Sequence, residues 1–575
     1  MKSILLKLLP VKRKSFVLWT FPLGFLALFY FYPLANIFSK SFEGGDTNFV
    51  STLIEAVTNA DVLDVLWFTT WQAALSTLLT LIVGLPGAYL FGRYTFRGKS
   101  LLRALTAIPF VLPTVVVATA FSAFLGPRGW LNLGLMSALN LDQAPINFVN
   151  TLSAILVAHI FYNTTIILRL VGDFWSNLDP KLEDAARTLG ANRWNTFRHV
   201  TLPLLAPAII AACLLIFIFD FTSFGVILIL GGPKFATMEV EIFTQTVGLN
   251  NLPLAAILSM LQLAATFGLV ALYQKFSSRL TRPLNIRPKL ITQQKLHGFS
   301  QKFYASLLIG FMLMFFVLPL VSLAARSVTR LEAERRQQTA VEVGLTLDYY
   351  RELSKNPRQS MFYAPPSRAI ITSIGYASMT AVIALGLALP AAWMLASNPG
   401  ARFHRLMDNI IMLPLGTSAI TLGLGFIVAF NRPPLDLRAS PLLIPLAHSL
   451  VAFPFVMRSL TPALKRIHPN LRRAAAVLGA APYQVFRHID LPLLGRALLA
   501  AAAFAFTISL GEFGASSLIT RPEYPTIPIM IFRFLSQPGA TNYGQAMALS
   551  TILMLVTGAG MLVIENLSLH GNREF

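Results

Sequence analysis

Residues 181–212 of the chain read KLEDAARTLGANRWNTFRHVTLPLLAPAIIAA, and residues 470–501 read NLRRAAAVLGAAPYQVFRHIDLPLLGRALLAA. At this constant offset of 289 residues, sixteen of the thirty-two positions are identical. In each copy a glycine, Gly190 or Gly479, precedes a leucine–proline pair by the same distance. Both copies lie between long apolar runs, so the chain is predicted to consist of two related halves.

The repeat extends beyond these two segments. At the same offset the Phe-Gly pair at 224–225 matches the Phe-Gly pair at 513–514, and Phe243 matches Phe532. Further upstream the offset is 305, so the second half is about sixteen residues shorter in between. Duplication followed by divergence is the simplest account of this pattern.

The composition favours a lipid bilayer as the solvent of this chain. Of its 575 residues 55% are apolar and only 12% are charged, more apolar material than a soluble core would bury. Apolar stretches of about twenty residues recur, each able to cross a hydrocarbon core of roughly 30 Å. The fold class is therefore predicted to be an all-α polytopic membrane protein with twelve transmembrane helices, in two six-helix halves that form a parallel repeat. The predicted spans are Ser15–Phe38, Thr69–Phe91, Ala104–Leu125, Val149–Leu168, Ala206–Leu230, Leu252–Gln274, Phe303–Ala325, Ile371–Asn398, Asn409–Asn431, Ala439–Met457, Ala497–Ile519 and Gln545–Ile564.

Charge around the first spans predicts the topology. Residues 2–14 hold five basic residues and no acid, and the first acidic residue is Glu43. The positive-inside rule then places both termini in the cytoplasm. Residues 276–302 are basic and acid-free and are read as a cytoplasmic linker, between a first half at 1–275 and a second at 303–575. The first apolar run is too long for a cleaved signal peptide, so a retained helix is expected.

Several function classes find no support. The net charge of +21 comes from short loops that flank the spans, which favours a topology signal over nucleic-acid binding. The single cysteine, Cys213, cannot form an intrachain disulfide. Because no metal-ligand spacing, Walker-type phosphate loop or nucleophile elbow occurs, we expect neither an enzyme nor a cofactor bound by this chain.

The repeated segment is typical of a short cytoplasmic helix, a turn and re-entry into the membrane. Ala185 and Ala186 offer a smooth surface to a partner, and Gly190 allows the backbone conformation that ends a helix. Pro203 suits the first turn of the next span, where its missing N–H does no harm. The functional residues of this first loop, 181–203, are predicted to be Asp184, Ala185, Ala186, Gly190, Leu202 and Pro203.

This motif resembles the EAA loop of type I ABC importer permeases, in a fused double-length form that covers essentially the whole chain. The resemblance implies a multi-pass protein of a bacterial or archaeal cell (inner) membrane that takes a small solute from an extracytoplasmic binding protein. It also implies a cytoplasmic ATPase dimer that binds and hydrolyses the ATP, with each loop docking as a coupling helix. The two halves would then rock between inward-open and outward-open states.

The second copy departs from the family pattern. Its loop, 470–492, has Arg473 where the first has Asp184 and the family usually has glutamate, so that docking site is expected to be weaker or to use other contacts. The competing interpretation is a pair of amphipathic interfacial helices without a partner. The corresponding coupling residues are Arg473, Ala474, Ala475, Gly479, Leu491 and Pro492.

The substrate is suggested by four further segments. GPRGWLNLGL (126–135), AHIFYN (158–163), LGGPKFATMEVEIF (230–243) and SLGEFGASSL (509–518) look most like thiamine permeases. Ferric-iron permeases share the last of these in similar form. We therefore expect thiamine or ferric iron as the transported solute.

Candidate pathway residues are the polar side chains inside predicted spans. Asp220 and Glu512 each stand shortly before a Phe-Gly pair, and buried carboxylates in a span are costly and by default functional candidates. His159 and Asn163 are further candidates. The alternatives remain open: either carboxylate can accept hydrogen bonds at a helix break or pair with an arginine, and the other groups can form hydrogen bonds between helices.

Two other classes compete with an ABC permease. A secondary transporter driven by an ion gradient can also have six plus six spans, but the repeated cytoplasmic loops argue against it. A membrane enzyme is disfavoured because the intramembrane carboxylates and histidines show no spacing typical of a catalytic pair.

Overall fold

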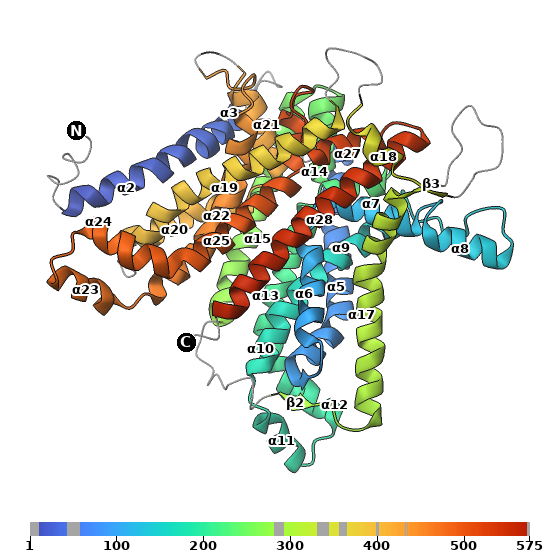
Figure 1. Cartoon of the computed structure of the whole chain (residues 1–575), viewed down its shortest axis with the longest axis horizontal. Helices are drawn as coiled ribbons and strands as arrows, with labels where there is room; N and C mark the ends of the chain where they lie inside the picture. Colours follow the sequence, from blue (N-terminus) through green and yellow to red (C-terminus); the bar gives the residue numbers. More distant parts are fainter. Residues whose placement is uncertain are drawn as a thin grey trace.

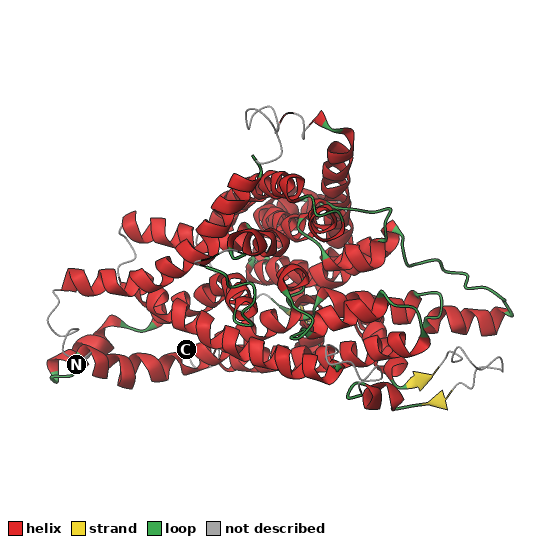
Figure 2. Cartoon of the chain, turned by 90° about the horizontal axis from the view of Figure 1, so that it is seen from above, coloured by secondary structure: helices red, strands yellow, loops and turns green. Residues whose placement is uncertain are grey.

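The computed structural model describes residues 11–42, 54, 58–280, 293–330, 344–355, 365–397, 402–431, 433 and 435–571. Residues 2–10 of the basic amino terminus, Glu43 and residues 281–292 of the predicted linker lie outside this part of the chain. Figure 2 shows helices throughout the described chain and short strands only at its periphery. The predicted all-α class is confirmed.

The elements of the first half run in the order α2 (Val11–Leu26), η1 (Ala27–Phe31), α3 (Tyr32–Lys40), α5 (Ala60–Arg93), β1 (Tyr94–Thr95), α6 (Lys99–Val111), α7 (Thr114–Leu125), α8 (Trp130–Leu139), α9 (Leu152–Ile166), η2 (Ile167–Val171), α10 (Gly172–Asn177), α11 (Lys181–Thr188), α12 (Arg193–Thr196), η3 (Phe197–Thr201), α13 (Leu202–Phe221), η4 (Ile227–Gly231), α14 (Met238–Phe243), η5 (Thr244–Gly248) and α15 (Leu252–Leu280).

The linker contains β2 (Gln294–Lys295), and the elements that follow are α17 (Phe299–Ser327), β3 (Thr329–Arg330), β4 (Gly344–Leu345), α18 (Asp348–Glu352), α19 (Pro366–Ser397), α20 (Arg402–Met412), η6 (Leu413–Gly416), α21 (Ala419–Ala429), α22 (Leu443–Arg466), α23 (Pro469–Val477), α24 (Pro482–Val485), η7 (Phe486–Asp490), α25 (Leu491–Gly511), α26 (Gly514–Ile519), α27 (Ile527–Leu535) and α28 (Ala540–Gly571).

In the described chain, ten helices are long and apolar enough to cross a membrane, and two bent helix pairs bring the number to twelve if each pair is one span. Each of them overlaps one predicted span. The third span of each half was expected to be continuous and is instead broken, with bends of 109° between α6 and α7 and of 95° between η6 and α21. Prolines explain the breaks, because Pro109 and Pro113 flank the first and Pro414 precedes the second.

The fifth span of each half also differs from the prediction. It starts earlier, at Arg193 or Tyr483, and ends at Phe221 or Gly511, before the Phe-Gly pair rather than beyond it. The π-helical turns η3 and η7 directly precede the leucine–proline pairs. A π-turn shifts the hydrogen-bond register of the helix by one residue at the place where proline cannot donate, so the helix continues through this position.

The first helix of each half packs on the other half (Figure 1). Helix α3 contacts α21 and α2 contacts α19, while α17 contacts α6 and α7. The Tyr30 hydroxyl, in η1, lies 2.7 Å from the Thr417 hydroxyl, between η6 and α21. This exchange interlocks the halves, and the largest hydrophobic core accordingly contains residues of both.

Two short strand pairs complete the described structure. β1 pairs in parallel with β2, so the end of the linker is fastened beside the end of α5, and β3 pairs antiparallel with β4. Figure 1 shows α11 and α12 at one end of the molecule and α23 and α24 at another, with α14, α21 and α27 grouped together away from both. The two repeated loops are therefore far apart while the opposite ends of the bundles meet.

Candidate functional site

The repeated loops form the predicted helices. Helices α11 and α23 contain no buried residue. Each ends before a glycine with positive φ, +89° at Gly190 and +84° at Gly479. A Cβ atom there would meet nothing within 4 Å, so the left-handed backbone and not lack of space favours glycine.

The outward faces of both loops present the same three apolar positions. Leu189 and Leu478 are 89% and 87% exposed, and equivalent positions hold the exposed pairs Leu182 with Leu471 and Trp194 with Tyr483. We call Leu182, Leu189 and Trp194, with Leu471, Leu478 and Tyr483, the apolar docking faces. Exposed apolar patches are surfaces for contact with a partner protein or with lipid. The sequence analysis missed them, although both leucine pairs are identities within the repeat.

One residue of each helix faces inward and fastens it to the base of the fifth span. In the first half the Glu183 carboxylate accepts a hydrogen bond of 2.8 Å from the Thr201 hydroxyl and also pairs with Arg93 at the end of α5. In the second half Arg472 Nε donates to Asp490 Oδ1 at 2.8 Å. In each contact the two residues are eighteen positions apart, and the two pairs are equivalent at the offset of 289. The residue on the helix accepts the hydrogen bond in the first half and donates it in the second.

A cleft of about 680 Å³ adjoins the first of these contacts. Arg93, Glu183 and Arg187 line it, together with aromatic residues of α5 and α17 such as Tyr89 and Tyr304. The inner side of α11 thus borders open space, whereas its inward carboxylate is held by two donors.

The predicted coupling residues fall into two groups. Asp184 and Arg473 are exposed; Asp184 lies 3.9 Å from Arg187, and Arg473 contacts the Asn470 side chain at 3.5 Å. The charge reversal noted in the sequence therefore lies on the outer surface. Of the alanines, the first of each pair (Ala185, Ala474) is exposed and the second (Ala186, Ala475) is half-buried, while Leu202, Pro203, Leu491 and Pro492 lie on the following span, outside the coupling helices.

Asp220 and its predicted neighbours form one cluster inside the first half. Asp220 Oδ1 accepts a hydrogen bond of 2.7 Å from Asn163 and lies 3.3 Å from His159 Nδ1. His159 Nε2 lies 2.9 Å from the Ser223 hydroxyl. All four side chains are buried, and they come from α9 and from the end of α13 and the residues after it. The structure therefore brings three of the four pathway candidates together, within one bundle.

The equivalent cluster in the second half uses the same parts in exchanged positions. His448, which matches His159 at offset 289, lies 2.8 Å from the Ser509 hydroxyl and 3.1 Å from Glu512 Oε2. Ser509 stands where the first half has Asp220, so the carboxylate and the serine have changed sides of the histidine. The offset applied to the histidines would have revealed this pair from the sequence.

Glu512 also caps a helix. Its carboxylate accepts hydrogen bonds from the backbone N–H groups of Ala515 and Ser516, at 2.8 and 3.0 Å, at the start of α26. This is the helix-break alternative that the sequence left open, and it applies to Glu512 and not to Asp220.

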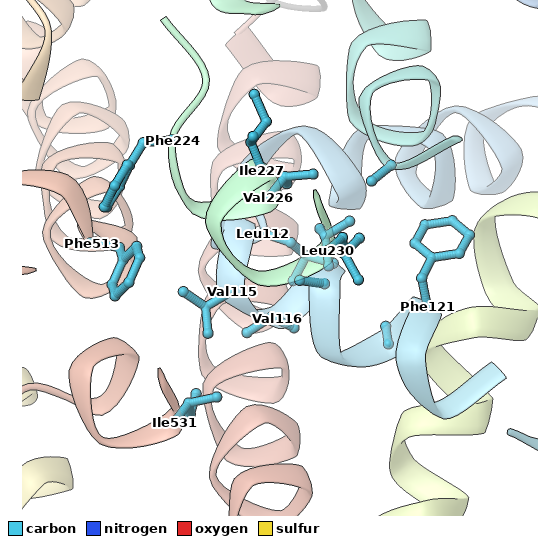
Figure 3. Close-up of a cluster of buried hydrophobic side chains, with 14 of the residues drawn as sticks. Leu112, Val115, Val116, Phe121, Phe224, Val226, Ile227, Leu230, Phe513 and Ile531 are labelled. Atoms are coloured by element: carbon cyan, nitrogen blue, oxygen red, sulfur yellow. The ribbon is translucent and has the colours of Figure 1, made fainter. Parts of the chain in front are cut away.

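The Phe-Gly pairs meet where the two halves join. The rings of Phe224 and Phe513, equivalent residues of the repeat, stack with centroids 5.3 Å apart (Figure 3). Phe243 contacts Phe224 and Phe532 contacts Phe513, so the arrangement continues symmetrically on both sides. We call these four residues the phenylalanine junction.

The glycines of the pairs permit this contact. A Cβ at Gly225 would lie 2.4 Å from the Thr114 hydroxyl oxygen, and one at Gly514 would lie 2.9 Å from the Ala419 Cβ. Thr114 and Ala419 begin α7 and α21, the helices after the two breaks. Each half thus needs glycine so that its phenylalanine can sit against the broken third span.

One carboxylate that the sequence analysis did not single out lies at the same junction. Glu239 of α14 is 1% exposed, and its Oε2 accepts a hydrogen bond of 2.5 Å from Ser418 of the second half. Its Oε1 accepts one of 2.6 Å from Gln262 of α15. A signal was present, because Glu239 and Glu241 stand among apolar residues in the segment 230–243.

Comparisons with known proteins agree with this architecture. The chain is 26% identical over 511 residues to the thiamine transport system permease protein ThiP of Escherichia coli (strain K12), covering 87% of this chain and 88% of that protein. It is 26% identical over 561 residues to ThiP of Brucella abortus (strain 2308), covering 96% of both. A probable ABC transporter permease protein of Sinorhizobium fredii is 24% identical over 551 residues, covering 94% of both.

Among solved structures, a bacterial ABC transporter involved in the import of the acidic polysaccharide alginate aligns with a TM-score of 0.40 and 16% identity, over 47% of this chain and 98% of that chain. The family model for binding-protein-dependent transport system inner membrane components matches twice, at residues 84–282 and 388–567. The chain therefore belongs to the family of binding-protein-dependent transport system inner membrane components, as an ABC importer permease with the family domain present in both halves.

Proposed function

We propose that this chain forms the complete membrane pathway of an ATP-driven importer that receives thiamine from an extracytoplasmic binding protein and releases it into the cytoplasm. A separate ATPase dimer binds and hydrolyses the ATP, and the chain itself binds no cofactor. Both termini and both coupling helices lie on the cytoplasmic side.

The observation that carries this proposal is the pair of apolar docking faces. Each holds two leucines and one aromatic residue at equivalent positions, on α11 or α23, directly after it, and on the short helix α12 or α24 that follows. Two such faces, at separate ends of the two bundles, suit a partner with two equivalent grooves.

Thiamine is supported by relatives that match along nearly the whole chain. The chemistry of the junction is compatible with it, because thiamine is an aromatic cation and the junction offers phenylalanine rings and a carboxylate. These relatives are named as thiamine permeases, which is the reason to prefer thiamine over ferric iron.

The contacts support the following mechanism. The phenylalanine junction closes the path between the halves while the coupling helices are apart, which corresponds to an inward-facing state. ATP binding draws the two ATPase subunits, and with them α11 and α23, together. The inward contacts of Glu183 and Arg472 pass this movement to the fifth spans, whose far ends lie shortly before the stacked phenylalanines of the junction.

The test is thiamine uptake into proteoliposomes that contain this chain, its ATPase and its binding protein. We expect uptake to require ATP and to persist when a protonophore and a sodium ionophore collapse the ion gradients. Uptake without ATP that disappears with the gradient would instead establish a secondary transporter.

A further inference from the structure

The Glu239 carboxylate differs from the buried carboxylates of Asp220 and Glu512 because one of its hydrogen bonds crosses between the halves. Asp220 is held by Asn163 within the first half, and Glu512 by His448 and by backbone groups within the second. Glu239 instead shares its two oxygens between Gln262 of its own half and Ser418 of the other. Among the described residues no basic side chain pairs with it, so only neutral donors hold this carboxylate.

The repeat provides no second copy of this contact. At the equivalent positions the second half has Pro528 in place of Glu239, and the first half has Pro113 in place of Ser418. Proline has neither a side-chain acceptor nor a donor. The Glu239 carboxylate therefore has no counterpart at the equivalent position of the second half.

Separation of the halves changes the surroundings of Glu239. Ser418 is fixed to α21, because its hydroxyl also accepts hydrogen bonds from the N–H groups of Ile420 and Thr421 at the start of that helix. When the halves part, Ser418 moves away with α21 and Glu239 stays with Gln262. One carboxylate oxygen then faces the opened path without a donor, in apolar surroundings where an uncompensated charge is costly.

An organic cation suits this opened site. Phe243 lies one helical turn after Glu239 on α14, and its ring contacts Phe224 at a centroid distance of 5.3 Å. A carboxylate beside aromatic rings binds a solute that combines a positive charge with a flat ring, through charge pairing and ring contact. We propose that Glu239 is the residue of the pathway that binds the cationic part of the transported solute. When the path is closed, the Ser418 hydroxyl occupies the position of that cation beside the Glu239 carboxylate.

This inference rests on the proposed import of an aromatic cation, and it is tested with thiamine in the reconstituted transporter. Glu239→Gln keeps the size and removes the charge, so we expect thiamine uptake to fall about tenfold or more, the scale of one hydrogen bond to a charged group. Glu239→Asp keeps the charge and should retain more uptake than Glu239→Gln. Ser418→Ala removes the closed-state donor and leaves the carboxylate, so uptake should stay within about fivefold of the parent chain, which is roughly the 1 kcal/mol that a capping group contributes.

The outcomes separate the possible errors. Equal losses in Glu239→Gln and Ser418→Ala would reduce Glu239 to a latch between the halves, and unchanged uptake in Glu239→Gln, or equal uptake in the Asp and Gln variants, would also overturn the inference. If the parent chain itself carries no thiamine, the proposed function fails first. Competition with 3-deazathiamine, a neutral analogue of similar shape, gives an independent readout: the parent chain should prefer thiamine, and Glu239→Gln should lose that preference.

Discussion

The contact between Arg472 and Asp490 is expected to hold the second coupling helix to its span. Asp490 is 2% exposed and Arg472 is 25% exposed, and their contact of 2.8 Å joins α23 to the base of α25. Replacing Arg472 by alanine leaves a buried carboxylate without this donor. A hydrogen bond to a charged group contributes about 1.5–3 kcal/mol, and the partial exposure of Arg472 favours a value of about 2 kcal/mol.

A loss of about 2 kcal/mol raises the population of the detached helix roughly thirtyfold, since each 1.4 kcal/mol is a factor of ten. Arg472→Glu is expected to be worse, because two like charges about 4 Å apart repel by about 4 kcal/mol near a protein surface. Combining it with Asp490→Thr recreates the carboxylate–hydroxyl contact of Glu183 with Thr201 in the first half. Recovery should be partial, because Glu183 has a second donor in Arg93.

Hydrogen–deuterium exchange of the α23 amides, in the intact chain in lipid nanodiscs, measures the detachment without relying on transport. We expect faster exchange in Arg472→Ala, the fastest in Arg472→Glu, and slower exchange again in the double variant. Arg473→Ala, at the exposed neighbouring position, is the matched control and should exchange like the parent chain. A double variant as fast as Arg472→Glu, or an Arg472→Ala variant equal to the control, would refute the assigned role.

Three further predictions concern the docking face, the junction and the polar cluster. Leu189→Ser should weaken binding of the ATPase about tenfold or more, because burying a leucine in the interface contributes about 1.5–3 kcal/mol. The control Leu345→Ser, at an equally exposed position in β4, should leave the Kd for the ATPase unchanged. Equal Kd values for the two variants would contradict the docking assignment. Phe513→Ala should open the junction and let a small solute leak from proteoliposomes without ATP. Phe121→Ala, inside the first half, is the control: both variants should lose about 3–5 kcal/mol of stability, but only Phe513→Ala should leak. Asp220→Asn should lower the melting temperature, because it loses about 1–3 kcal/mol of stability. The thiamine concentration at half-maximal uptake should stay within about twofold of the parent chain. A large rise in that concentration would show that Asp220 contributes to the transport pathway.

Periodic features of this fold could be predicted from the sequence, and contacts between distant residues could not. Apolar runs gave the spans, because length and charge decide whether a segment enters lipid. The 109° break after Pro109 was missed because proline inside an apolar run is compatible with a continuous span as well as with a kink. The contact of Glu239 with Ser418 joins residues 179 positions apart, and only the packing of the halves brings them together.

The sequence also did not predict which residue of α11 faces inward. The sequence drew attention to Asp184 because the motif is defined there, but a helix turns about 100° per residue, so its neighbour Glu183 faces another direction. The structure places Glu183 inward, on Thr201, and Asp184 outward. Which of the two faces the membrane depends on the turn before the helix, and that turn has no periodic signal.

Equivalent contacts occur in both halves even where the residues that form them differ. The inward contact of α11 and of α23 occurs in both halves, with the helix residue accepting the hydrogen bond in the first and donating it in the second, and the histidine cluster occurs in both with its carboxylate and serine exchanged. Such paired changes are expected where a contact is needed on both sides and its polarity is not, because a single change would leave a buried charge without a partner. The bond between Glu239 and Ser418 stands apart, since prolines occupy both equivalent positions. A contact needed only to hold two equivalent bundles together would have a reason to occur on both sides, whereas a charge that binds a single solute on the shared axis is needed once.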